Sequence, residues 1–94
     1  MIVVGAGASG MTAALVAANE GASVLVLEST SHIGGTSARS SGTLWIPRDT
    51  AAAGTYLDAL VGDKADRAMR QAFLAAGPAM IAYLEKHAGF RYPR

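Results

Sequence analysis

The stretch Gly5-Ala-Gly-Ala-Ser-Gly10 decides the fold expected of this 94-residue chain. It follows the β-branched run Ile2–Val4 and precedes residues 11–20, whose apolar positions repeat with helical spacing. Gly21 is a typical helix stop, and Ser23–Leu27 is an apolar run too short for a helix. The sequence therefore predicts an α/β fold that begins with strand, tight turn, crossover helix and buried parallel strand, a right-handed βαβ unit of the Rossmann type.

The three glycines of that stretch have different expected roles. Gly5 permits a tight turn after the strand, Gly7 lets the backbone approach a pyrophosphate, and Gly10 lets the helix pack closely on the strand. The unpaired amides and the positive dipole end of the helix then form an anion site. This agrees with the sequence, which has no lysine or arginine before Arg39.

Glu28 stands at the end of the second apolar run, 18 residues beyond Gly10. A carboxylate at this place can accept hydrogen bonds from both hydroxyls of an adenosine ribose, and it repels the 2′-phosphate of NADP. The spacing therefore predicts binding of an ADP-containing dinucleotide. The alternative interpretation is a glycine turn followed by a solvent-facing glutamate.

A second glycine pair, Gly34-Gly35, follows six residues after Glu28 and lets the chain run tightly along a second stretch of cofactor. Together the two glycine stretches resemble the FAD-binding N-terminus of the glutathione-reductase-like flavoproteins. Within that group they resemble the fumarate reductase/succinate dehydrogenase flavoprotein family. Residues 34–47 are most similar to its 3-ketosteroid dehydrogenase-like branch.

The resemblance implies an FAD site whose residues follow the parts of the cofactor. It places three residues at the pyrophosphate: Ala8, Ser9 and Gly10. It places Glu28 and Ser29 on the adenosine side. The residues implied for the flavin-ward half are Gly35, Thr36 and Ser37, and those implied near the isoalloxazine ring are Ser41 and Gly42.

The resemblance also bears on how the flavin is attached. Membrane-bound members of the family attach it covalently through a histidine in a His-Ser-Ala context, and the matching residues here are Thr36-Ser37-Ala38. Threonine cannot form that bond, and His32 is interpreted as an ordinary loop histidine. Noncovalent FAD is therefore expected.

The implied function is that of a flavin-dependent oxidoreductase acting on a carbon-carbon bond next to a carbonyl. The expected partners are a steroid-like ketone or an unsaturated acid, and an electron acceptor or donor. Catalytic residues are expected beyond Arg94, so the 94-residue chain by itself is expected to be inactive. Two alternatives stay open: an NAD-dependent dehydrogenase, which gives no reason for residues 34–37, and a truncated noncatalytic fragment.

The whole chain is interpreted as an incomplete FAD-binding domain with three parts: residues 1–28, a flavin-side loop over 29–49, and a helical segment over 50–94. Trp45 is interpreted as a structural anchor that packs under the cofactor loop, in preference to a substrate contact. The expected helices are residues 50–61, 64–76 and 78–87. Asp63 is expected to cap the second, Pro78 to occupy the first position of the third, and Gly89 to end it.

Composition excludes several classes of function. A net charge of +1 gives no electrostatic case for nucleic acid, and the absence of cysteine excludes thiolate metal sites and disulfides. Asp63, Asp66 and Arg67 offer no convergent metal ligands. Residues 1–19 carry no charge, but glycine, serine and threonine interrupt them and no basic leader precedes them, so neither a membrane span nor a secretion signal is expected. A cytoplasmic location is the resulting expectation.

Overall fold

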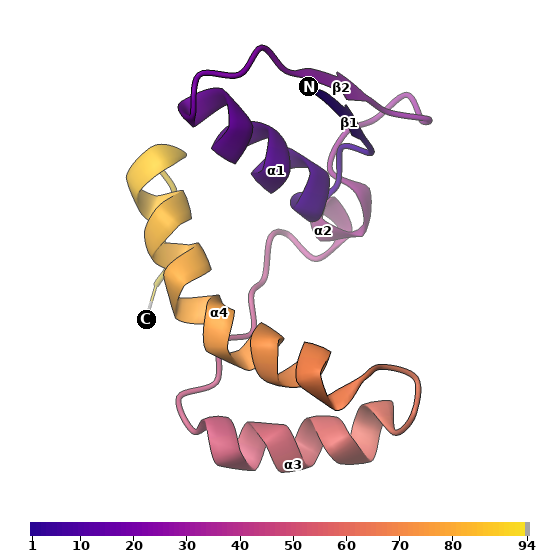
Figure 1. Ribbon diagram of the computed structural model, residues 1–94, viewed down its shortest axis with the longest axis vertical. Helices are drawn as coiled ribbons and strands as arrows, with labels where there is room; N and C mark the ends of the chain where they lie inside the picture. The colour runs from indigo at the N-terminus through magenta and orange to yellow at the C-terminus, as the bar shows by residue number, and fades with distance from the viewer. Residues whose placement is uncertain (94) are drawn as a thin grey trace. The chain divides into compact units, whose positions relative to one another are not determined.

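The computed structural model describes residues 1–93 and divides the chain into two compact units, one over Met1–Leu44 and one that begins at Trp45. The first unit contains β1 (Ile2–Val4), α1 (Ala8–Asn19), β2 (Leu25–Leu27) and α2 (Gly35–Arg39). The second contains α3 (Thr50–Val61) and α4 (Arg67–His87) (Figure 1). The two units are therefore described separately.

In the first unit, β1 and β2 pair in parallel and α1 connects them, as the sequence predicts. The register places Ile2 opposite Leu25 and Val4 opposite Leu27. One further bond extends the ladder past β1, because the Gly5 N–H donates to the Leu27 carbonyl at 2.7 Å. The helix begins three residues earlier than expected and the second strand begins two residues later.

The expected burial of the strands is only partly correct. Val3 is 8% exposed, whereas its neighbour Val4 is 82% exposed. Leu25 and Leu27 are also exposed, so the prediction of a buried second strand is wrong for these side chains. Successive residues of a strand point to opposite faces, and α1 packs against one face of this two-stranded sheet.

The segment expected to be a continuous loop, residues 29–49, contains the short helix α2. Its N-cap is Gly34, in the left-handed region with φ +108°, and its last turn ends at Ser40. Left-handed backbone follows at once, because Ser41 has φ +54° and Gly42 has φ +72°. The prediction of a continuous loop is therefore wrong for residues 35–39.

In the second unit, α3 has the bounds that the sequence predicts, and the Asp49 side chain caps it by accepting a hydrogen bond from the Ala52 amide at 2.9 Å. The two further helices expected over 64–76 and 78–87 are one helix, α4, with Pro78 inside it. Figure 1 shows α4 changing direction along its length, as an internal proline promotes. Its N-cap is Asp66 and not Asp63.

The end of α4 agrees with the prediction. The helix ends at His87, Ala88 is its C-cap, and Gly89 follows with φ +70°. A left-handed glycine just beyond a helix is a common terminator.

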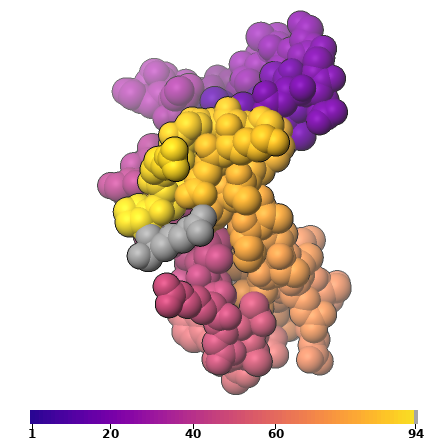
Figure 2. Space-filling model, turned by 90° about the vertical axis from the view of Figure 1, so that its left-hand side faces the viewer, coloured from indigo at the N-terminus to yellow at the C-terminus, as the bar shows by residue number. Residues whose placement is uncertain are grey.

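The core of the second unit lies between α3 and α4, whose atoms meet in the space-filling view (Figure 2). Ala53 and Leu74 are its buried apolar side chains. Trp45 stacks on Phe73 at a ring-centroid distance of 6.2 Å and meets Tyr56 edge-on at 5.9 Å. These contacts make Trp45 an anchor for α3 and α4, whereas its packing under the cofactor loop stays a prediction.

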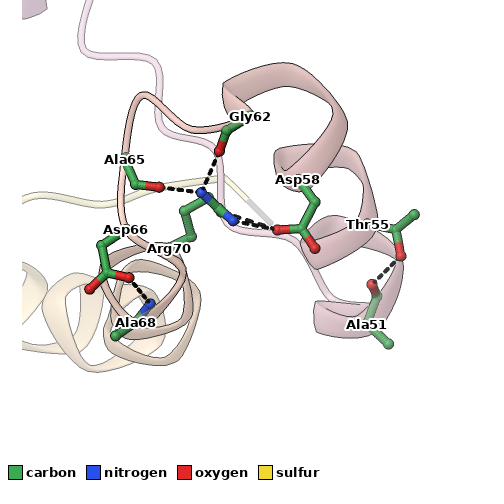
Figure 3. A network of polar contacts seen from close by, with 8 residues as sticks. All are labelled: Ala51, Thr55, Asp58, Gly62, Ala65, Asp66, Ala68 and Arg70. Carbon is green, nitrogen blue, oxygen red and sulfur yellow. Dashed lines mark hydrogen bonds and ion pairs between the residues drawn. The ribbon is translucent and has the colours of Figure 1, made fainter.

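Arg70 fixes the turn between α3 and α4 (Figure 3). Its guanidinium pairs with Asp58 at 2.9 Å and donates hydrogen bonds to the carbonyls of Gly62 and Ala65. The Arg70 side chain is 14% exposed, whereas that of Asp58 is 53% exposed. One arginine of α4 therefore holds both α3 and the turn that follows it.

Candidate functional site

The glycine turn between β1 and α1 has the backbone that the motif requires at two positions. Gly5 has φ +97°, a conformation that residues with a side chain rarely adopt. A Cβ added to Gly10 would lie 1.9 Å from the Gly5 carbonyl oxygen and 3.3 Å from Val3 Cγ1. The tight turn and the close packing of helix on strand are therefore both visible.

Gly7 is the N-cap of α1, with extended backbone at φ −79° and ψ −176°. A Cβ added there would meet nothing within 4 Å, so the space beside this residue is free of protein atoms. Gly7 has no side chain to cap the helix, and no acidic residue lies in the first turn of α1. The N-terminal amides and the positive dipole end of α1 are thus available to an anion.

The Glu28 carboxylate follows β2 and is held by four hydrogen bonds. Its Oε2 accepts from the Ala6 amide at 2.9 Å. Its Oε1 accepts from the Thr30 amide at 2.9 Å, from the Thr30 hydroxyl at 3.1 Å and from the Ser29 hydroxyl at 3.3 Å. The carboxylate therefore has a fixed position without any ligand.

These bonds lower the pKa of Glu28 from 4.5 to about 2. The largest cause is the hydrogen bond from the Ala6 amide, and the Thr30 amide and hydroxyl follow. Donors that point at a carboxylate stabilise its charged form. Glu28 is therefore ionised throughout the neutral range and acts there as an acceptor only.

The second glycine pair lies against the first glycine turn. The Gly34 amide donates to the Ala6 carbonyl at 2.8 Å, and a Cβ added to Gly35 would lie 3.3 Å from Gly7 Cα. Ala6 itself is 1% exposed. Glu28 and both glycine stretches, which lie up to 30 residues apart in the sequence, thus meet at Ala6.

The other expected site residues are spread over the helix and the turn that follow. Thr36 and Ser37 lie on α2, while Ser41 and Gly42 form the left-handed turn after it. Within residues 1–93, no hydrogen bond joins Ser41 or Gly42 to the first glycine turn.

Sequence reasoning missed two participants, Ala6 and Thr30. Ala6 contributes only backbone atoms, so no residue-type signal exists for it. Thr30 could have been found, because a hydroxyl two residues after an acid commonly bonds to it in a turn.

The residues present fit an ADP-containing group. The free space beside Gly7 is where a Cβ would intrude, and the α1 amides offer donors to a pyrophosphate. Each carboxylate oxygen has two lone pairs, and Oε2 of Glu28 uses one of them for Ala6. An acceptor for a ribose hydroxyl therefore remains.

The described residues bear on two other kinds of site. Residues 1–93 hold no group of three or more potential metal ligands. No helix within them is both long enough and apolar enough to cross a membrane.

Comparison with known proteins adds independent information. The family model described as "FAD binding domain" matches residues 1–94. The chain is 45% identical over 98 residues to 3-oxosteroid 1-dehydrogenase of Mycobacterium tuberculosis (strain ATCC 25618 / H37Rv), a match covering 93% of the chain and 17% of the relative. It is 41% identical over 98 residues to 3-oxosteroid 1-dehydrogenase of Mycolicibacterium smegmatis, again with 93% of the chain and 17% of the relative covered.

A relative named for a smaller substrate also matches. 4-oxocyclohexanecarboxylate 2-dehydrogenase of Sinomonas cyclohexanicum is 39% identical over 103 residues, which cover 98% of the chain and 18% of that protein. The chain thus spans less than a fifth of the length of these three relatives. No solved structure matches it significantly.

Proposed function

The chain belongs to the FAD binding domain family, and we propose that it forms the FAD-binding portion of a flavin-dependent oxidoreductase. The proposed reaction is dehydrogenation or reduction of a carbon-carbon bond next to a carbonyl. The convergence of Glu28 and both glycine stretches on Ala6 is the structural observation that supports it best. The names of the three relatives, each a dehydrogenase of an oxo compound, support the reaction class.

In this proposal the first unit adopts a Rossmann-type, glutathione-reductase-like fold, and its residues bind different parts of the cofactor. The pyrophosphate lies at the N-terminus of α1, against Ala8, Ser9 and Gly10. A ribose hydroxyl donates to the lone pair of Glu28 Oε2 that Ala6 leaves free, with Ser29 beside it. The residues proposed for the flavin-ward half and the ring are Gly35, Thr36, Ser37, Ser41 and Gly42.

The bound flavin supplies the hydride chemistry, and the residues of this chain bind and orient it. Because Thr36 stands where a covalent histidine would be needed, attachment is noncovalent. The substrate class is a small ketone, steroid-like or a cyclic oxo acid. No residue of the chain is assigned a catalytic role.

The test is a titration of purified, flavin-free protein with FAD, compared with Glu28→Arg and with Glu20→Arg as the control of equal charge change. Glu20 is the exposed C-cap of α1. Glu28→Arg is expected to weaken FAD binding by at least about tenfold, because hydrogen bonds to a charged group are lost. Glu20→Arg should leave the affinity unchanged.

Two results would contradict the proposal. Equal FAD affinity of the Glu28→Arg and wild-type proteins would remove the ribose assignment. Binding of NADH and not of FAD in the same titration would favour the nicotinamide alternative. Flavin that stays with the protein after acid precipitation would contradict noncovalent attachment alone.

A further inference from the structure

In the glycine turn, both peptide groups that flank Ala6 are held by long-range hydrogen bonds. The Gly5–Ala6 peptide donates its N–H to Glu28 Oε2 at 2.9 Å. The Ala6–Gly7 peptide accepts from the Gly34 amide at 2.8 Å. The two peptide planes that flank Ala6 are thus fixed by residues at least 22 positions away.

We propose that Glu28 is a positioning residue for the glycine turn, acting through the Ala6 amide, besides any contact that it makes with a ribose. The inference rests on the proposed FAD site, because the turn is taken to be the phosphate-binding element. The residue proposed to bind the ribose therefore also determines the backbone conformation at the proposed pyrophosphate site.

Burial explains why the Ala6 amide needs this partner. Ala6 is 1% exposed, so water cannot readily replace the carboxylate as the acceptor. A buried amide without an acceptor carries its full desolvation cost, and the turn would rotate the peptide to avoid that cost. Gly5, with φ +97°, offers little resistance to such a rotation because it has no side chain.

The two roles of Glu28 predict opposite effects on a ligand that lacks the ribose hydroxyls. If Glu28 acts only on the ribose, removing its negative charge leaves the binding of such an anion unchanged or makes it tighter. If Glu28 positions the turn, the same substitution weakens the binding. The glutamine of Glu28→Gln has one acceptor oxygen, so it cannot serve Ala6 and Thr30 together.

The experiment compares ADP with 2′,3′-dideoxy-ADP on purified, flavin-free wild-type protein, on Glu28→Gln and on the control Glu20→Gln, using calorimetry. Glu28→Gln is expected to bind 2′,3′-dideoxy-ADP at least about tenfold more weakly than wild type, the effect of losing a hydrogen bond to a charged group. Glu20→Gln should match wild type. Equal or tighter binding of the dideoxy ligand by Glu28→Gln overturns the proposal.

A ligand-free measurement separates this inference from the cofactor assignment. Amide hydrogen exchange in wild-type protein should be slow at Ala6 and faster at Gly7, for which the structure records no acceptor within residues 1–93. Fast exchange at Ala6 overturns the positioning role, even where Glu28→Gln fails to fold. Failure of wild type to bind ADP would instead refute the proposed FAD site, and the exchange result would still decide the inference.

Discussion

Substitution of Gly10 by alanine tests whether the motif's third glycine is needed for packing. The new Cβ would lie 1.9 Å from the Gly5 carbonyl oxygen, whereas real Cβ atoms essentially never approach within 3.0 Å. The start of α1 must therefore move away from the turn by about 1 Å, because Glu28 holds the Gly5–Ala6 peptide in place through the Ala6 amide. Forced overpacking costs about 1 to 3 kcal/mol, and a rigid backbone contact belongs at the upper end.

Alanine also favours a helix over glycine by about 1 kcal/mol, which offsets part of this cost. The net expectation for Gly10→Ala is a loss of about 2 kcal/mol in the free energy of unfolding. Cofactor binding should fall as well, because the turn that carries Gly7 moves with the helix start.

Gly7→Ala is the matched variant in the same turn. Its Cβ meets nothing within 4 Å, and φ −79° suits alanine, so only the poorer N-cap propensity counts against it. That costs about 0.5 to 1 kcal/mol. The added methyl would nonetheless occupy the space proposed for the pyrophosphate, so FAD affinity should fall while the fold is largely retained.

Urea denaturation of the flavin-free proteins measures stability, and FAD titration of the folded proteins measures binding. Gly10→Ala should be the less stable variant, and Gly7→Ala should lose affinity out of proportion to its small loss of stability. The reasoning is refuted if Gly10→Ala is as stable as wild type, or if Gly7→Ala binds FAD normally.

Three further predictions concern other parts of the chain. Arg70→Ala should lower the free energy of unfolding by about 1 to 3 kcal/mol, because it leaves two turn carbonyls and Asp58 without their donor. The control Arg67→Ala changes an exposed side chain and should alter the free energy of unfolding by less than about 0.5 kcal/mol in the same urea assay. Folding lowers the pKa of Glu28 from 4.5 to about 2, so the stability that ionised Glu28 contributes is fully present above pH 4.5 and is lost as the pH falls toward 2. In an acid titration of Glu28→Gln, the loss of stability over this pH range should be smaller than in wild type. Gly42→Ala should cost about 1 to 2 kcal/mol because of its φ of +72°, and a neutral result in thermal unfolding would mean that the turn after α2 has another conformation in solution.

The first unit shows which parts of a fold can be predicted from local rules. The turn at Gly5 and the close approach at Gly10 follow from the steric properties of glycine, so the sequence alone was enough to predict them. The burial of Leu25 and Leu27 was not predictable in this way, because a side chain is buried only where another element covers it. A run of apolar residues indicates that a strand can be buried, not that a layer lies on both of its faces.

The second unit shows tertiary packing overriding a local signal. The sequence predicts a helix start at Pro78, because the first helical position tolerates a missing amide donor, whereas proline in a helix interior costs about 3 kcal/mol. α4 nevertheless continues through it, and the residue just before it, Gly77, is buried against Ile46. A Cβ on Gly77 would lie 2.9 Å from Ile46 Cδ1, so α4 packs closely on this side chain at the proline. Because α4 begins at Arg67, its N-cap is Asp66 and not the predicted Asp63.

Glu28 shows how a motif can describe a residue incompletely. The motif predicts that the carboxylate binds a ligand. In the structure Oε1 accepts hydrogen bonds within its own turn, and Oε2 accepts one from Ala6, 22 residues away. The first of these bonds is local and could be predicted, but the second depends on the parallel pairing that brings Gly5 beside Leu27. An exchange of Glu28 meant to admit a 2′-phosphate would therefore also remove the acceptor of a buried amide. Such a redesign would have to supply Ala6 with another acceptor before the nucleotide preference could change without loss of the turn.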